Sequence, residues 1–235
     1  MPKLPDYKNK KQLRVALEGL GRSFNRGEYL RYNLVVYSVG NNTIRAFKIN
    51  KHNNQHPSVT FQEWANDSFI KNYPTLIKTL LNINSQQEYD KWHNKLCNSF
   101  DRYWYKKMGY RIGYGPSRKL PDLLLKVFVL GSEDIPDANR SVLIKLLHVP
   151  LDSYSLTAIM NCVDDYLKDD NSVLTIKEKR FMAAKQNRIN KYSTMKWVDN
   201  KDKYMILQKI IRDIAENAKA PAIYLDLLAW DESHK

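Results

Sequence analysis

The sequence predicts a mostly α-helical protein with a small β-hairpin extension near its N-terminus. Over residues 59–235, apolar side chains recur every three or four positions, which is the period of an amphipathic helix. Residues 34–49, in contrast, contain two short runs rich in β-branched residues on either side of a turn sequence. We therefore expect a basic N-terminal segment with the hairpin over residues 1–58 and a helical domain over residues 59–235.

The predicted hairpin consists of strands at residues 34–39 and 43–49. The sequence Gly40-Asn41-Asn42 lies between them. Glycine and asparagine tolerate the positive φ angles that a tight hairpin turn requires.

Ser/Thr-x-x-Glu sequences at residues 60–63, 85–88 and 175–178 predict helix starts, because the hydroxyl and the carboxylate satisfy backbone amides there. The helix after residue 85 has an aromatic and apolar stripe that we interpret as a core face. The stripe consists of Tyr89, Trp92, Leu96, Phe100 and Tyr103. Further helices are expected at about 117–130, 138–147, 153–167, 176–190, 202–218 and 221–230.

The histidine and cysteine residues do not predict a metal site. His52 and His56 have the spacing of helical metal ligands, but they lie in an Asn-rich stretch before Pro57 that is typical of a solvated linker. Cys97 and Cys162 are too few for a disulfide framework, and two ligands do not make a zinc or iron–sulfur site. We expect no metal and no cofactor.

The charge balance favours a polyanionic partner. Lys and Arg total 38 against 25 Asp and Glu, and the net charge is +13. Neutralising phosphates with such cations releases counterions and drives association with nucleic acid. The alternative is a basic protein whose charge only keeps it dispersed.

No apolar run approaches the roughly 20 residues that cross a bilayer, and the N-terminus lacks the apolar core of a signal peptide. We therefore expect a protein of the cytoplasm, associated with the nucleoid, without a membrane partner.

Residues 108–154 contain the residues that suggest chemistry. Gly109, Gly113 and Gly115 precede Pro116 and a leucine-rich helix. Glycines allow a sharp turn, and proline suits a first helical position. The amides exposed at such a helix start can hold a DNA phosphate.

Two short sequences in this segment carry a resemblance to a known family. Residues 115–119 read Gly-Pro-Ser-Arg-Lys, and residues 149–152 read Val-Pro-Leu-Asp. Over about 45 residues the chain resembles the helix-hairpin-helix DNA glycosylase superfamily. The separation of 33 residues between Lys119 and Asp152 is similar to that in the archaeal 8-oxoguanine glycosylase branch and in bacterial glycosylases that attack modified viral bases. The usual hairpin has a glycine where this chain has Ser117.

The resemblance implies that Lys119 is the nucleophile and Asp152 the catalytic carboxylate of base excision. A glycosylase flips the nucleotide out of duplex DNA before it attacks. A carboxylate stabilises the positive charge that develops on the sugar, and the imine formed by a lysine permits AP-lyase strand cleavage. Which base is removed, and whether the role is repair or antiviral defence, stay open.

Three nearby residues have alternative interpretations. Lys126 lies seven residues after Lys119, on nearly the same helical face, so it is either the nucleophile or a positive neighbour. Asp152 also has the position of an N-cap for the following helix. Asp122 is interpreted as a helix-start or salt-bridge residue.

The DNA contacts are expected around the glycine-rich turn, on a protein that acts as a monomer on double-stranded DNA. Basic side chains would hold phosphates and aromatic rings would stack on the flipped base. The candidates for phosphate contacts are Lys106, Lys107, Arg111, Gly113, Gly115, Ser117 and Arg118, and those for the base pocket are Trp104 and Tyr105. A solvated basic face is the alternative.

Two other functions fit the sequence. A basic helical protein can use such a hairpin only to grip DNA, without catalysis. A metal-dependent restriction-type nuclease is suggested by Pro121-Asp122 together with Asp199-Asn200-Lys201, although these lie in no strand-like setting.

Overall fold

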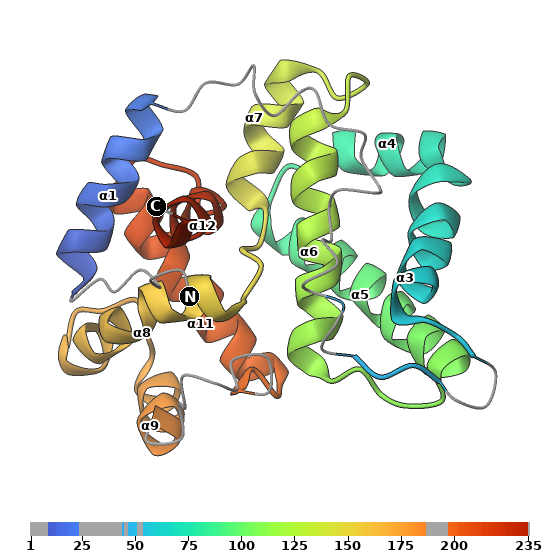
Figure 1. Ribbon diagram of the computed structural model, residues 1–235. Coiled ribbons are helices and arrows are strands. Elements are labelled where there is room, and N and C mark those ends of the chain that lie inside the picture. The colour runs from blue at the N-terminus through green and yellow to red at the C-terminus, as the bar shows by residue number, and fades with distance from the viewer. Residues whose placement is uncertain (1–8, 24–43, 45–46, 51–53, 187–196, 235) are drawn as a thin grey trace. The chain divides into compact units, whose positions relative to one another are not determined.

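The computed structural model describes residues 9–23, 44, 47–50, 54–186 and 197–234 (Figure 1). These residues contain ten α-helices and one π-helical segment, and no strand. The prediction of a mostly helical protein is therefore confirmed. Within the described residues, no helix combines the length and the apolar content needed to cross a membrane.

The chain forms two compact units. Residues 1–25 and 148–235 make one unit, which we call the terminal unit, and residues 26–147 make the other, the central unit. The division therefore falls near residues 25 and 147, whereas the sequence analysis placed its single boundary at residue 58.

The predicted hairpin lies largely outside the described residues, which include neither its first strand nor its turn. Residues 47–49 of the second strand are described and have no strand structure. Asn50 forms an isolated antiparallel bridge with Gln55.

The terminal unit is a cluster of helices from both ends of the chain (Figure 1). Its helices are α1 (Lys10–Ser23), α8 (Ser153–Lys168), α9 (Ile176–Gln186), α11 (Lys201–Asn217) and α12 (Tyr224–His234). Leu13 and Leu17 of α1 are fully buried, and α1 contacts α8, α11 and α12. Lys10 adds polar contacts to α8, because its backbone amide donates to Asp165 (2.9 Å) and its ammonium to Asp169 (2.9 Å).

The central unit is built around α5. Its elements are α3 (Pro57–Ala65), the π-helical segment η2 (Asn66–Ile70), α4 (Tyr73–Leu81), α5 (Gln86–Met108), α6 (Tyr114–Gly131) and α7 (Asp137–Leu146). Phe61 and Trp64 of α3 pack against Phe100 of α5, with ring centroids 5.8 and 4.7 Å away.

The buried face of α5 differs from the predicted stripe. It consists of Tyr89, His93, Cys97, Phe100, Trp104 and Met108. Trp92, Leu96 and Tyr103 are only half-buried, so the predicted face is right for Tyr89 and Phe100 alone. The true face also follows three- and four-residue steps, but it includes a histidine and a cysteine that an apolar pattern passes over.

Two of the three predicted helix starts are confirmed. Ser85 and Glu88 form a capping box before α5, and the Thr175 and Glu178 side chains make the same reciprocal bonds before α9. The start predicted at residues 60–63 is wrong, because α3 begins at Pro57. The hydroxyl of Thr60 instead donates to a backbone carbonyl one turn earlier.

Candidate functional site

A short turn between two helices positions the candidate site. Helix α5 ends at Met108 and α6 begins at Tyr114. Gly109 (φ 74°) ends α5 in the left-handed region, and Gly113 (φ 92°, ψ 155°) precedes α6 in a region that is essentially restricted to glycine. The two helices and the turn thus form a helix–turn–helix hairpin whose ends both depend on glycine.

Helix α6 begins three residues before the predicted start at residue 117. Pro116 fits inside the first turn, where helical amides have no partner within the helix. Lys119 is consequently the sixth residue of α6 and lies in its second turn, whereas a helix that began at residue 117 would place it in the first turn. Pro121 lies inside the helix and, lacking an amide, leaves Ser117 without the usual helical bond to its carbonyl.

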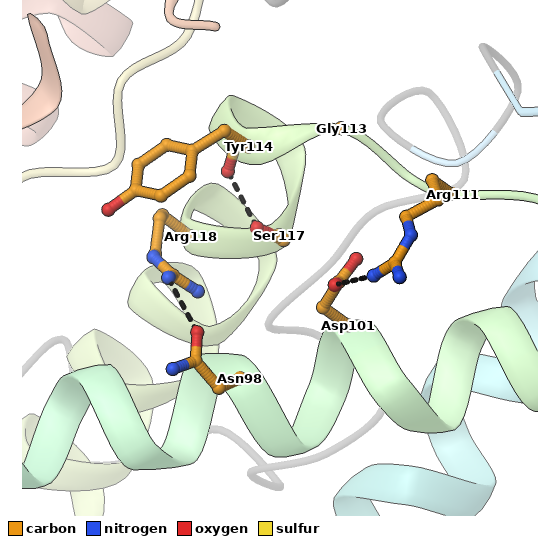
Figure 2. Close-up of a pocket in the computed structure, with 7 residues that line it drawn as sticks. All are labelled: Asn98, Asp101, Arg111, Gly113, Tyr114, Ser117 and Arg118. Carbon is orange, nitrogen blue, oxygen red and sulfur yellow. Dashed lines mark hydrogen bonds and ion pairs between the residues drawn. The ribbon is translucent and has the colours of Figure 1, made fainter. Parts of the chain in front are cut away.

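A pocket of about 220 Å³ opens where the turn meets α5 (Figure 2). It is lined by Asn98, Asp101, Arg111, Gly113, Tyr114, Ser117 and Arg118. All seven residues belong to the central unit. Four of them, Arg111, Gly113, Ser117 and Arg118, were predicted as DNA-binding residues, and the pocket brings these four together.

Arg118 is the buried guanidinium of the pocket. It is 5 % exposed and donates to the side-chain oxygens of Asn98 (2.8 Å) and Asn94 (3.2 Å) on α5. Its guanidinium lies 4.4 Å from the centre of the Tyr114 ring. These contacts fix the orientation of a delocalised cation in the wall of the pocket.

Arg111 is the exposed guanidinium of the pocket. It pairs with Asp101 of α5 (3.0 Å), and 70 % of its side chain is exposed. It also lies over the ring of Tyr105, 5.1 Å from the centroid. In Figure 2 both arginine side chains extend toward α5. An anion in the pocket would therefore meet two cations and one carboxylate.

A buried acid–base pair lies between α5 and α6. His93 Nε2 is 2.6 Å from an Asp122 oxygen and 3.3 Å from Cys97 Sγ. The imidazole stacks on Tyr89 with an interplanar angle of 19°. Burial acts to lower the pKa of His93, but electrostatic interactions and hydrogen bonds with Cys97 and Asp122 raise it overall.

The other predicted residues of the central unit are spread over α5 and α6. Lys106 is exposed, and Lys107 pairs with Glu63 (2.8 Å). Trp104 is fully buried in the core, whereas Tyr105 is 51 % exposed. The remaining three lie on α6: Gly115 and Lys119 are buried and Lys126 is half-buried.

Asp152 lies in the terminal unit and begins α8. Its Oδ1 accepts the backbone amides of Tyr154 (2.9 Å) and Ser155 (3.0 Å), and the Ser155 hydroxyl accepts the Asp152 amide (2.8 Å). The prediction that Asp152 is an N-cap is thereby confirmed. This carboxylate is held in a fixed orientation by the helix that it caps.

The sequence analysis missed His93, Asn98, Asp101 and Tyr114 as site residues. His93 and Asn98 give little local signal, because one interrupts an apolar face and the other is a common surface residue. More than one stripe joins Tyr89 to Phe100 in steps of three and four residues, and the one that starts with two four-residue steps passes through His93 and Cys97. That stripe was the available signal.

Comparison of the chain with models of protein families, with curated proteins and with solved structures gives no match. The likeness to helix-hairpin-helix glycosylases therefore rests on the motif residues themselves.

Proposed function

We propose that the protein is a DNA glycosylase that binds duplex DNA through the α5–turn–α6 hairpin and excises a damaged or modified base. The observation that carries the binding half of this proposal is the pocket at the start of α6, with Arg111 and Arg118 in its wall. A planar guanidinium group can donate hydrogen bonds to two oxygens of one phosphate. The backbone amides at the start of a helix also bind phosphate.

The charge of the whole chain supports a nucleic-acid ligand over a small anion. A net charge of +13 attracts a long polyanion far more strongly than a single phosphate, because each neutralised phosphate releases counterions. The exposed Tyr105 ring beside Arg111 offers a stacking surface for an unpaired base.

The reaction half of the proposal rests on the sequence resemblance. The amine of Lys119 attacks the anomeric carbon of the flipped nucleotide as the N-glycosidic bond breaks, with the electron pair of that bond leaving on the base. The lysine nitrogen loses a proton when it forms the new bond, and the departing base gains one. The sugar ring opens to an imine on the lysine nitrogen, and β-elimination from that imine cleaves the strand. Asp152 is assigned the carboxylate that stabilises the developing positive charge. Lys126 is the alternative nucleophile.

Borohydride trapping tests the reaction. Purified protein is incubated in EDTA with duplexes that carry a series of damaged and hypermodified bases, and the imine is reduced to a stable amine. We expect a covalent protein–DNA adduct with at least one duplex, retained in Lys126→Gln and lost in Lys119→Gln. The reverse pattern transfers the nucleophile to Lys126. Absence of both adduct and base release from every duplex would refute the glycosylase.

A non-catalytic DNA-binding protein is the second candidate, because the pocket is complete within the central unit and contains neither Lys119 nor Asp152. It predicts salt-dependent binding without base release.

Both candidates predict that Arg111→Ala weakens DNA binding and lowers the slope of log K against log salt by about 1. Arg102, an exposed arginine of α5 outside the pocket, is the matched control. An unchanged slope in Arg111→Ala would exclude the pocket as the binding site.

The nuclease alternative gains no support from the placement of its residues. Asp122 is hydrogen bonded to His93 inside the central unit, and Asp199 pairs with Lys203 (2.9 Å) at the start of α11. Cleavage that needs Mg²⁺ and stops in EDTA would revive this alternative.

A further inference from the structure

The segment that leads to Asp152 is held by a side chain from a distant helix of the same unit. Gln208 of α11 is 1 % exposed. Its amide nitrogen donates to the carbonyl of Val149 (2.7 Å), and its amide oxygen accepts the backbone N–H of Val149 (2.9 Å). A side-chain amide thus satisfies both backbone groups of one residue, as a neighbouring strand would.

A second contact comes from the preceding turn of α11. Tyr204 lies four residues before Gln208, and its hydroxyl is 3.0 Å from Nδ1 of His148. Both His148 and Tyr204 are 2 % exposed. Residues 148 and 149 are therefore fixed by side chains from consecutive turns of one face of α11.

Short-range hydrogen bonds connect the backbone that follows Val149 to Asp152 and Ser155. The carbonyl of Pro150 accepts the Asp152 amide (3.1 Å) and the Ser155 hydroxyl (2.8 Å). That hydroxyl in turn accepts the Asp152 amide (2.8 Å). A rotation of the backbone at Val149 would therefore move Pro150 and tilt the Asp152 carboxylate relative to the start of α8.

We propose that Gln208 is a positioning residue for the Asp152 carboxylate in base excision, an inference that rests on the proposed function. The amide of Gln208 fixes the backbone dihedrals of Val149, and the rigid Val149–Asp152 segment carries that orientation to the carboxylate. A displacement of about 1 Å in a reacting group can lower a rate roughly 100-fold. Gln208 thus acts on the turnover step and not on the affinity for DNA.

The substitution Gln208→Leu tests this role, since it keeps the size of the side chain and removes both bonds to Val149. We expect kcat for base release to fall about 10- to 100-fold with KM for DNA unchanged within about twofold. In the Asp152→Asn background, where the cap is retained but the carboxylate is absent, Gln208→Leu should cause no further loss. An equal additional loss in that background would overturn the proposal, because Gln208 would then act independently of Asp152.

Hydrogen exchange provides a readout that does not depend on activity. In Gln208→Leu the amides of Tyr154 and Ser155, which cap on Asp152, should exchange about tenfold faster, as expected for the loss of a hydrogen bond of ordinary strength. The control Tyr166→Phe removes the hydrogen bond between α8 and Asp213 of α11 at the other end of α8, and should leave both amides unchanged.

Tyr204→Phe is a milder second variant in case Gln208→Leu does not fold. It removes only the hydroxyl beside His148 and should lower kcat about threefold to tenfold. Unchanged exchange at Tyr154 and Ser155 in Gln208→Leu would refute the positioning role even in an active enzyme. Faster exchange in Gln208→Leu, together with a wild-type protein that releases no base, would instead refute the proposed function and leave the coupling from Gln208 to Asp152 standing.

Discussion

His93 and Asp122 form a buried histidine–carboxylate pair inside the central unit, and each side chain is a hydrogen-bond partner that stabilises the other. Both are at most 2 % exposed, and removing one partner of such a pair leaves a buried polar group that has lost its main compensation. The pair also links α5 to α6. Its protonation state therefore contributes to the stability of the unit that contains the pocket.

The raised pKa of His93 predicts a specific pH dependence. Because the pKa in the folded protein lies above the ordinary value of 6.5, folding favours the protonated ring. The stabilisation is complete below about pH 6.5 and is lost as the pH rises through the folded-state pKa. We expect the difference in unfolding free energy between wild type and His93→Gln, measured by urea titration, to shrink from pH 6.5 upward.

His56→Gln is the matched control, since His56 is exposed and lies in the same unit. Its difference from wild type is the baseline against which the His93→Gln difference is compared at each pH. A His93→Gln difference that stays constant relative to this baseline would show that the imidazole gains no proton on folding.

The turn between α5 and α6 depends on two glycines whose backbone angles are unfavourable for other residues. Gly109 adopts left-handed helical angles (φ 74°, ψ 3°), which an L-residue reaches at a cost of about 1 kcal/mol. Gly113 (φ 92°, ψ 155°) lies where essentially only glycine is found, and a side chain there costs up to about 3 kcal/mol.

We therefore predict that Gly113→Ala destabilises the central unit more than Gly109→Ala does. Space alone gives no such order, because a Cβ at either position meets no atom closer than 3.5 Å. Urea unfolding of the two variants compares the costs directly, and Gly113→Ala should also weaken DNA binding because it shifts the start of α6. Equal destabilisation would mean that the turn relaxes around both side chains.

The existence of α5, α6 and α8 follows from the sequence, whereas the buried face of α5 and the exact start of α6 do not. Helix α8 begins directly after Asp152, as its cap predicts, because the signal is local. Helix α6 begins earlier than its leucine pattern suggests, since Gly113 and not Pro116 sets its start. The partners of Arg118 on α5 depend on how two helices pair, and no local pattern encodes that pairing.

At the scale of the molecule, the terminal unit is assembled from two segments that are distant in the chain. Helix α1 supplies Leu13 and Leu17, both fully buried, to a core that it shares with α8, α11 and α12. From the sequence, residues 10–23 were assigned to a basic N-terminal segment and no helix was predicted there. The stability of such a helix comes mainly from packing against distant parts of the chain, which no local pattern shows.

This assembly predicts that damage to α1 loosens the terminal unit. Leu13→Ala should lower its stability by about 2–5 kcal/mol, and hydrogen exchange should accelerate at Ile210 of α11. Val15→Ala, at a position that is 54 % exposed, should change stability by less than about 0.5 kcal/mol. Exchange at Phe100 in the central unit is the internal reference. Equal acceleration at Ile210 and Phe100 would indicate one cooperative body and not two units.

Because the terminal unit is built from both ends of the chain, its two segments are synthesised at different times. About 130 residues separate the end of α1 from the start of α8, so at roughly 5–20 residues per second the ribosome needs on the order of 10 s to deliver the first partner of α1. The central unit, contiguous in the chain, emerges entirely within that interval. Until then Leu13 and Leu17, which are fully buried in the folded protein, lack their native neighbours on the nascent chain.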